Sequence, residues 1–297
     1  MLVCLNNIHY FYIMASNSDY TTVIKPHAGL FNLKLREVWA YRDLVFILAR
    51  RDIVAVYKQT ILGPLWFLIS PALTVIVYMF VFGSIAGIST DGMPQAVFYL
   101  GGITLWNYFS SCFTATANTF TANAQIFGKV YFPRIVAPMA NVLANMVKLG
   151  IQMLLFLVVL CYFMYQEGSS VAITKEIYLL PILIIMMAGL SLGIGIIISS
   201  LTTKYRDLKN FIGFGVSLLM YASPVIYPIS AVKDKGYGEL LAYNPIAPII
   251  ETFRYIFTGY GHLDWRGLLI SGLVTLAILL LGLVLFNRVE RTFMDTV

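Results

Sequence analysis

The chain has 297 residues, of which 59% are hydrophobic and only 11% are charged, and its formal net charge is +6. A soluble domain has about 45–50% apolar and about 25% charged residues, so this composition excludes a soluble fold, which would expose large apolar patches. Disorder is excluded because it needs low hydrophobicity. What remains is a membrane protein that crosses the bilayer several times.

Residues 1–31 come first, and we interpret them as a flexible tail. Leu2–Met14 is apolar, but it has neither a basic n-region nor an A-x-A cleavage site, so it does not resemble a signal peptide. The three cysteines, Cys4, Cys112 and Cys161, are widely spaced and odd in number. They predict neither a disulfide framework nor a metal site.

Residues 32–60 are the most charged stretch of the chain. Apolar residues recur there at helical spacing, at Leu35, Val38, Trp39, Phe46, Ala49 and Ile53. With basic flanks, this pattern predicts an amphipathic helix in the membrane interface. The helix is either a plain anchor or a collar that also contacts a partner protein.

Residues 61–290 hold six charge-poor runs, each close to the roughly 20 residues that a bilayer-spanning helix needs. The runs are Pro64–Ala86, Val97–Phe120, Ile135–Tyr165, Ile177–Thr203, Asn210–Tyr227 and Gly267–Phe286. Barrel strands would instead alternate over about ten residues. The predicted fold class is therefore an all-α integral membrane protein with six transmembrane helices. Residues 291–297 are a C-terminal tail.

The distribution of basic residues predicts the orientation. If both termini are cytoplasmic, the inner segments carry fourteen of the 20 Lys and Arg residues, the outer segments carry five, and Lys148 lies within a span. Because positive charge accumulates on the cytoplasmic side, we expect both termini there. The net charge therefore reflects topology, and no nucleic-acid partner is expected.

The inner loop at residues 123–138 joins the second and third spans. It mixes aromatic and basic side chains, at Phe127, Lys129, Tyr131, Phe132 and Arg134. Exposed aromatic residues beside cations are typical of protein interfaces, although a basic inner loop can also serve topology alone. No G-x-x-x-x-G-K-[ST] motif occurs, so any ATP used in transport must bind another polypeptide.

Two further features carry ionisable groups. Lys148 lies about twelve residues into the third span, where a charge is costly and suggests function, unless it snorkels to the inner face. The outer segment at residues 228–262 contains an apolar stretch too short to span, which predicts a re-entrant or interfacial helix. There Glu251 and Arg254, three apart, form either a local ion pair or a polar gate.

Five motifs, in order, resemble the ABC-2 type permeases that export polysaccharides and polyol phosphates, such as O-antigen, capsule or teichoic acid. They are Arg50–Pro71 (RRDIVAVYKQTILGPLWFLISP), Phe127–Pro138 (FGKVYFPRIVAP), Lys204–Asn210 (KYRDLKN), Ser223–Pro228 (SPVIYP) and Asn244–Gly259 (NPIAPIIETFRYIFTG). The order and spacing fit nearly the whole chain, from about residue 32 to residue 290.

The resemblance implies a homodimeric channel in the bacterial inner membrane, driven by two copies of a separate ATPase subunit that binds ATP and Mg²⁺. It implies that this chain binds no cofactor, that residues 123–138 include a coupling helix, and that short re-entrant helices line the outer mouth. The cargo would be a lipid-linked polysaccharide. In the family the first and fifth spans line the pore, so the candidate channel residues are Trp66, Tyr78, Tyr221 and Tyr227, together with Lys148.

Three other functions were weighed. A membrane-embedded transferase or hydrolase needs clustered catalytic groups, but His9, His27 and His262 are scattered and no general acid–base pair is evident, so no catalytic residue is expected. An ion-coupled transporter usually has acidic residues within its spans, and none is present. A small-molecule or drug exporter of the ABC-2 type is the main alternative.

Overall fold

The computed structural model describes residues 35–58, 61–130, 132–166, 171–205, 207–233 and 243–292. These ranges are helical and contain no β-strand, as the long apolar runs predict. The predicted tail at residues 1–31 and residues 293–297 of the predicted C-terminal tail lie outside the described residues. The arrangement below concerns the unit formed by residues 33–297.

Four helical segments are long and apolar enough to cross a membrane. They are Gly63–Ile85, which comprises η1 (Gly63–Leu65), α4 (Trp66–Tyr78) and η2 (Met79–Ile85); α8 (Val136–Tyr165); Lys175–Thr203, which comprises η3 (Lys175–Leu179) and most of α9 (Leu180–Lys204); and Trp265–Arg288 of α14 (Trp265–Thr292). The chain is therefore a multi-pass membrane protein, and four of the six predicted spans are confirmed by length and hydropathy.

The other two predicted spans are helices with different properties. α5 (Gln95–Ala117) is 23 residues long but too polar for the same criterion, and α10 (Leu208–Tyr221) is apolar but has only 14 residues. Most of α5 is buried, because α4, α8, α9, α10 and α13 (Ile246–Thr258) pack around it. A helix enclosed by protein needs few lipid-facing apolar side chains, which explains its Asn, Ser and Thr content.

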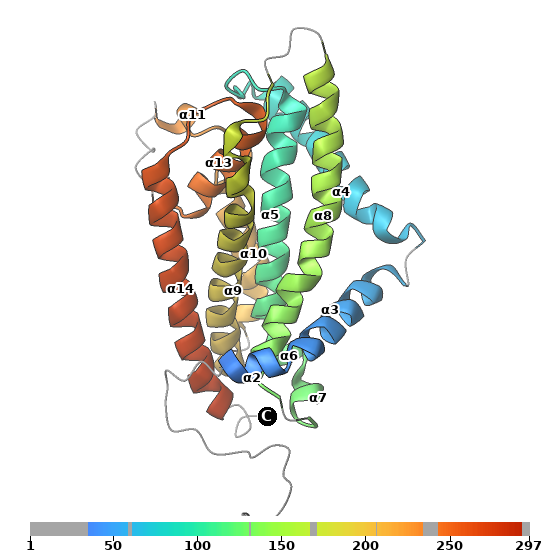
Figure 1. The fold of residues 1–297 in the computed structure, drawn as a ribbon, viewed down its shortest axis with the longest axis vertical. Helices are drawn as coiled ribbons and strands as arrows, with labels where there is room; N and C mark the ends of the chain where they lie inside the picture. The colour runs from blue at the N-terminus through green and yellow to red at the C-terminus, as the bar shows by residue number, and fades with distance from the viewer. Residues whose placement is uncertain are drawn as a thin grey trace, which may run out of the picture. The chain divides into compact units, whose positions relative to one another are not determined.

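Figure 1 shows α14, α9, α5 and α8 side by side, with α10 behind them. Short elements mark the two ends of this row. α2 (Leu35–Ala40), α6 (Thr119–Ala122) and α7 (Ala124–Phe127) lie at the lower end in Figure 1, whereas α11 (Ser230–Lys233) and α13 lie toward the upper end. The described parts of residues 123–138 and of residues 228–262 therefore lie at opposite ends, as the predicted topology requires.

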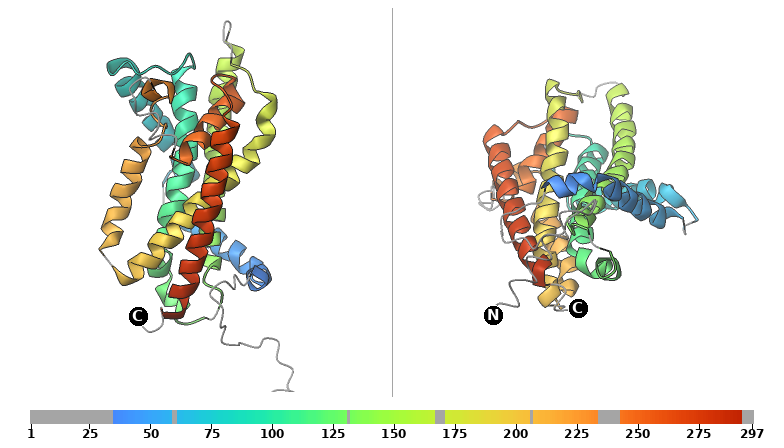
Figure 2. Two further views of the ribbon diagram at one scale, coloured as in Figure 1. Left: turned by 90° about the vertical axis from the view of Figure 1, so that its left-hand side faces the viewer. Right: turned by 60° about the horizontal axis from the view of Figure 1, so that its bottom comes forward.

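The predicted interface helix at residues 32–60 is two helices, α2 and α3 (Arg42–Tyr57), separated at Tyr41. α3 lies obliquely across the lower end of α8 (Figure 2). Its buried side chains are Val45, Leu48 and Ala49, whereas Phe46 is 61% exposed and Trp39 of α2 is 71% exposed. The predicted single apolar face is therefore divided: one side packs on protein, and the other is exposed. Its place in the membrane interface stays a prediction.

Close packing of α9 on α14 depends on glycine. A Cβ added at Gly193 would lie 2.9 Å from the Leu279 backbone nitrogen, and one added at Gly282 would lie 2.8 Å from the Gly193 carbonyl oxygen. Small residues let membrane helices approach to this distance and gain dispersion contacts. The Gly189-x-x-x-Gly193 pattern in the sequence thus marks a helix contact.

Cysteine labelling tests the predicted orientation. Ser89 lies between η2 and α5, Lys209 begins α10, and both are exposed. In a variant without Cys4, Cys112 and Cys161, we expect an impermeant maleimide to label Ser89→Cys in intact spheroplasts. Lys209→Cys should react only after permeabilisation. The reverse pattern would overturn the assignment of both termini to the cytoplasm.

Candidate functional site

The predicted coupling loop, residues 123–138, is anchored by aromatic rings. Phe127 and Phe132 are only 4% and 6% exposed. Their ring centroids are 5.6 Å apart, and Phe127 lies 6.1 Å from Phe120, which stacks on Phe286 of α14 at 5.0 Å. The expectation of exposed aromatic residues is therefore wrong for these two. Burial against α6 and α14 removes their apolar surface from water, which stabilises the loop.

The exposed part of the loop is its tip. Gly128 and Lys129 are exposed, and Val130 is 57% exposed. The Arg134 side chain is buried, with its guanidinium carbon 5.8 Å from the centroid of the Phe127 ring. Tyr131 lies outside the described residues. Of the five predicted docking residues, Lys129 is thus the one shown on the surface.

Three of the predicted channel residues come together from α4, α10 and the segment that follows α10. The Tyr78 hydroxyl donates to the Met220 sulfur at 3.9 Å. The Tyr227 hydroxyl donates to the Tyr221 carbonyl oxygen at 2.9 Å, and the Tyr221 ring is 61% exposed.

Trp66 and Lys148 lie elsewhere. Both line a cavity of about 240 Å³ between the start of α4, α5 and α8. The Lys148 ammonium is 5.7 Å from the centroid of the Phe67 ring, within the range in which a ring face attracts a cation. The predicted set of channel residues is therefore divided between two places, one at each end of α4.

Arg254 on α13 is fully enclosed and holds three carbonyl groups. Its Nε donates to the Phe98 carbonyl oxygen at 3.2 Å, while its two terminal nitrogens donate to the carbonyl oxygens of Pro224 and Val225, each at 2.8 Å. The guanidinium carbon lies 3.6 Å from the centroid of the Phe98 ring. Arg254 thus ties α13 to α5 and to the segment after α10.

The partners of Arg254 differ from the predicted ones. Glu251 accepts a hydrogen bond from the Ile229 backbone at 3.3 Å, while three N–H groups of Arg254 are bound to carbonyls. Burial lowers the pKa of Arg254 to about 10, partly offset by Glu251, so the guanidinium remains charged at neutral pH. Glu251 and Arg254 hold the same outer segment from two sides, and their role as a gate stays a prediction.

A row of amides on α8 is a feature that the sequence motifs do not include. Asn141, Asn145 and Gln152 share a helix face with Lys148, at spacings of four, three and four residues. That spacing within an apolar span was the available signal, because it follows the helical period. No three His, Cys, Asp or Glu side chains in the described ranges are placed to hold a metal ion.

Comparison with known proteins agrees with this architecture. The sequence pattern of the ABC-2 type transporter family matches residues 43–258. The chain is 28% identical over 253 residues to the O-antigen export system permease protein RfbA of Klebsiella pneumoniae, which covers 85% of this chain and 94% of that protein.

More distant relatives extend the similarity. The chain is 25% identical over 265 residues to the O-antigen export system permease protein RfbA of Myxococcus xanthus, covering 89% of this chain and 98% of that protein. It is 23% identical over 252 residues to the polysialic acid transport protein KpsM of Escherichia coli, covering 83% and 93%. The five motifs predicted this result, and the chain belongs to the ABC-2 type transporter family.

Proposed function

We propose that this chain is the permease subunit of an ABC transporter that exports a lipid-linked polysaccharide across the bacterial inner membrane. The observation that carries the proposal is the similarity along most of both chains to permeases named for O-antigen and polysialic acid transport. Two copies would form the channel, and two copies of a separate ATPase subunit would bind ATP and Mg²⁺. The chain itself would catalyse no covalent reaction.

The buried rings of the coupling loop support a mechanical role. Phe127 and Phe132 pack in one cluster with Phe120 of α6 and Phe286 of α14, while Lys129 remains outside. A well-packed cluster transmits displacement because interiors are dense and resist compression. A push on the tip by an ATPase would therefore move α3 and the lower ends of α8, α9 and α14 together, since all four contribute to this cluster.

The tyrosine group supports a channel for sugars. Tyr78 of the first predicted span gathers with Tyr221 and Tyr227 of the fifth, beside the end of α10. Aromatic faces can stack on the C–H faces of sugar rings and release them again, and conduction requires such weak binding. A second copy opposite this exposed group would complete the wall of a channel, since a closed two-fold dimer is the commonest assembly.

The outer segment supports a controlled exit. Arg254 and Glu251 fasten α13 to residues 224–229, which follow α10. Any opening at this end would therefore move α13 and the end of α10 as a unit. In this proposal the predicted gate is the joint movement of α13 and the end of α10.

Gene deletion tests the proposed function. Loss of the chain should abolish one surface polysaccharide and leave its lipid-linked precursor inside the cell, and the intact chain should co-purify with an ATPase. A strain that keeps all its surface polysaccharides but becomes sensitive to a toxic small molecule would favour the alternative, an ABC-2 exporter of small molecules or drugs.

Placing negative charges at the loop tip should weaken binding of the ATPase. We expect Lys129→Glu combined with Val130→Asp to reduce ATPase co-purification about tenfold or more, because a charge reversal and a buried carboxylate would both oppose docking. Lys58→Glu, which repeats the charge reversal of Lys129→Glu at an exposed position after α3, is the control. Unchanged association of the double variant would remove the tip from the coupling role.

A further inference from the structure

Polar side chains line the facing sides of α5 and α8 close to α3. Between these three helices lies a cavity of about 650 Å³, whose wall includes Arg51, Asn118, Asn141 and Lys148. The cavity of about 240 Å³ under the start of α4 adjoins it, because Ser111, Asn145 and Lys148 line both. The combined volume lies in the range typical of sites for small molecules.

Contacts between the two helices explain part of this polarity. The Asn141 amide donates to the Ala115 carbonyl oxygen at 3.2 Å, and the Asn107 amide donates to the Gln152 side-chain oxygen at 3.5 Å. Such bonds join membrane helices. Asn145 is different: it is 4% exposed, and its side-chain oxygen has no hydrogen-bond partner among the described residues. An unpaired buried acceptor costs free energy, and a donor on a molecule bound in the cavity would relieve that cost.

The charges of the cavity wall are also unbalanced. Two cations, Arg51 and Lys148, face one carboxylate, that of Asp52. Asp52 is already bound to Arg51 at 2.8 Å. No carboxylate of the described residues lies within ion-pair distance of the Lys148 ammonium, whose described partner is the Phe67 ring. An ammonium at this depth predicts an anionic partner that is not part of the chain.

The wall selects the chemistry of that partner. Cations bind phosphoryl oxygens, while the amides and hydroxyls of Asn145, Ser111 and their neighbours suit a molecule rich in hydroxyl groups. Trp66, Phe67 and Tyr108 add apolar ring surface beside Lys148. A phosphate attached to a sugar combines all three features. The position between an interface helix and the first span also suits a molecule with a lipid tail.

We propose that this cavity, between α3, α5, α8 and the start of α4, binds the phosphate-linked sugar head of the lipid-linked substrate through Lys148 and Asn145. The inference rests on the proposed function and adds where the head is held before the polymer moves toward the tyrosines. The head group of an anionic phospholipid has related chemistry, and the test separates the two sources.

The test uses the full complex of this chain with its ATPase in nanodiscs of phosphatidylethanolamine. The probe is a prenyl diphosphate carrying N-acetylglucosamine, and the measurement is the lipid concentration for half-maximal stimulation of ATP hydrolysis. We expect Lys148→Gln to raise this concentration about tenfold or more, since it removes a charge-assisted contact. Asn145→Ala should raise it by a smaller factor, and Lys148→Arg should remain close to the original protein.

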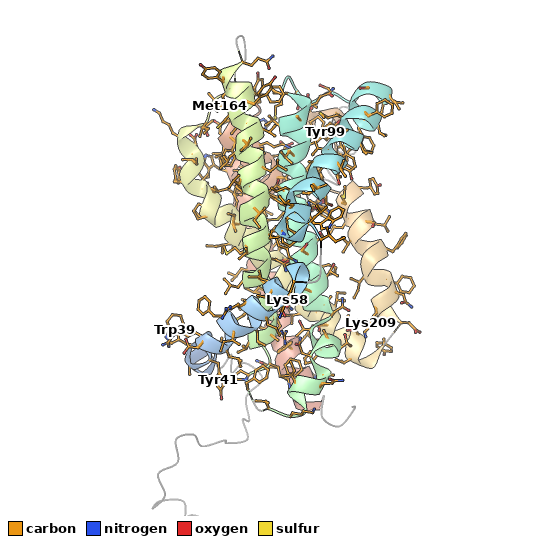
Figure 3. The ribbon with its side chains drawn as sticks, turned by 90° about the vertical axis from the view of Figure 1, so that its right-hand side faces the viewer. Trp39, Tyr41, Lys58, Tyr99, Met164 and Lys209 are labelled. Atoms are coloured by element: carbon orange, nitrogen blue, oxygen red, sulfur yellow. The ribbon has the colours of Figure 1, made fainter. Side chains whose placement is uncertain are left out.

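Lys209→Gln is the matched control, because it removes an exposed cation at the base of α10 (Figure 3). Equal elution volumes of the complexes establish that each variant is assembled. Unchanged lipid dependence of both Lys148→Gln and Asn145→Ala would overturn the inference. Equal competition by phosphatidylglycerol would overturn the assignment to the substrate and leave a phospholipid site.

The failure of this inference differs from failure of the proposed function. If Lys148→Gln and Asn145→Ala both export polysaccharide and respond to the probe normally, the site is wrong while the export function stands. If deletion of the gene leaves every surface polysaccharide in place, the proposed function is wrong, and this inference falls with it.

Discussion

Replacing Arg254 with alanine is expected to cause a large loss of stability in detergent. The change leaves the carbonyl oxygens of Pro224, Val225 and Phe98 without the donors that reach them at 2.8, 2.8 and 3.2 Å. Each buried group that loses its partner costs about 1–3 kcal/mol. A total of about 3 kcal/mol or more corresponds to a fall of about 5 °C or more in the unfolding temperature of a chain of this length.

Thermal unfolding of the purified chain, followed by light scattering and tryptophan fluorescence, measures this effect. Arg266→Ala is the control, because Arg266 is an exposed cation at the start of α14. If Arg254→Ala unfolds at the same temperature as Arg266→Ala, the three hydrogen bonds of Arg254 do not stabilise the protein. Arg254→Lys should be intermediate, since an ammonium cannot reproduce the planar arrangement of donors.

Gly102 provides a second test of the same contact. A Cβ at Gly102 would lie 2.6 Å from a terminal nitrogen of Arg254 and 2.8 Å from the Val225 carbonyl oxygen. Gly102→Ala should therefore displace Arg254 and destabilise the protein. In the Arg254→Ala background the same substitution should cost less, because one of the two clashes is gone, and this non-additivity is the signature of a shared contact.

Replacing Gly193 with leucine should prevent α9 and α14 from packing. Even a Cβ there would lie within 3.0 Å of backbone atoms of Leu279, and a backbone cannot move aside as a flexible side chain can. We expect the variant to accumulate at a small fraction of the normal level and to elute as aggregate in size-exclusion chromatography, since overpacking of a tight contact is strongly destabilising.

Gly150→Leu supplies the comparison for this prediction. Gly150 lies within α8, and a Cβ there meets no atom within 4 Å. The two substitutions change composition and hydropathy identically, so a difference between them reports packing alone. Equal yields of the two variants would show that the approach of α9 to α14 does not need glycine.

The pattern of hydropathy and charge along the sequence predicted much of the architecture. The third predicted span, Ile135–Tyr165, agrees within one residue with α8, whereas α10, in the fifth predicted span, ends at Tyr221, before the predicted Tyr227. This works because a membrane helix satisfies its own backbone hydrogen bonds, so its location depends mainly on the hydropathy of its own residues. The five motifs predicted the family for the same reason, since each is a short contiguous run.

The partners of individual side chains depended on the tertiary arrangement. Arg254 lies three residues from Glu251, yet its donors reach carbonyls of residues 98, 224 and 225. Phe127 and Phe132 belong to a loop whose composition suggests exposure, but Phe120 and Phe286 bury them. The burial of α5 likewise depends on helices before and after it in the chain.

For Lys148, too, the sequence predicts one part of the result and the tertiary structure determines the other. The cost of Lys148 within a span follows from the amino acid sequence alone, whereas the role of the amides around it became apparent only in the packed structure. Only the packed helices show that this row of amides faces α5 across a cavity. They also show that Asp52 is already bound to Arg51. Sequence periodicity reports which residues share a face of one helix. Which surface that face meets depends on contacts between residues far apart in the chain.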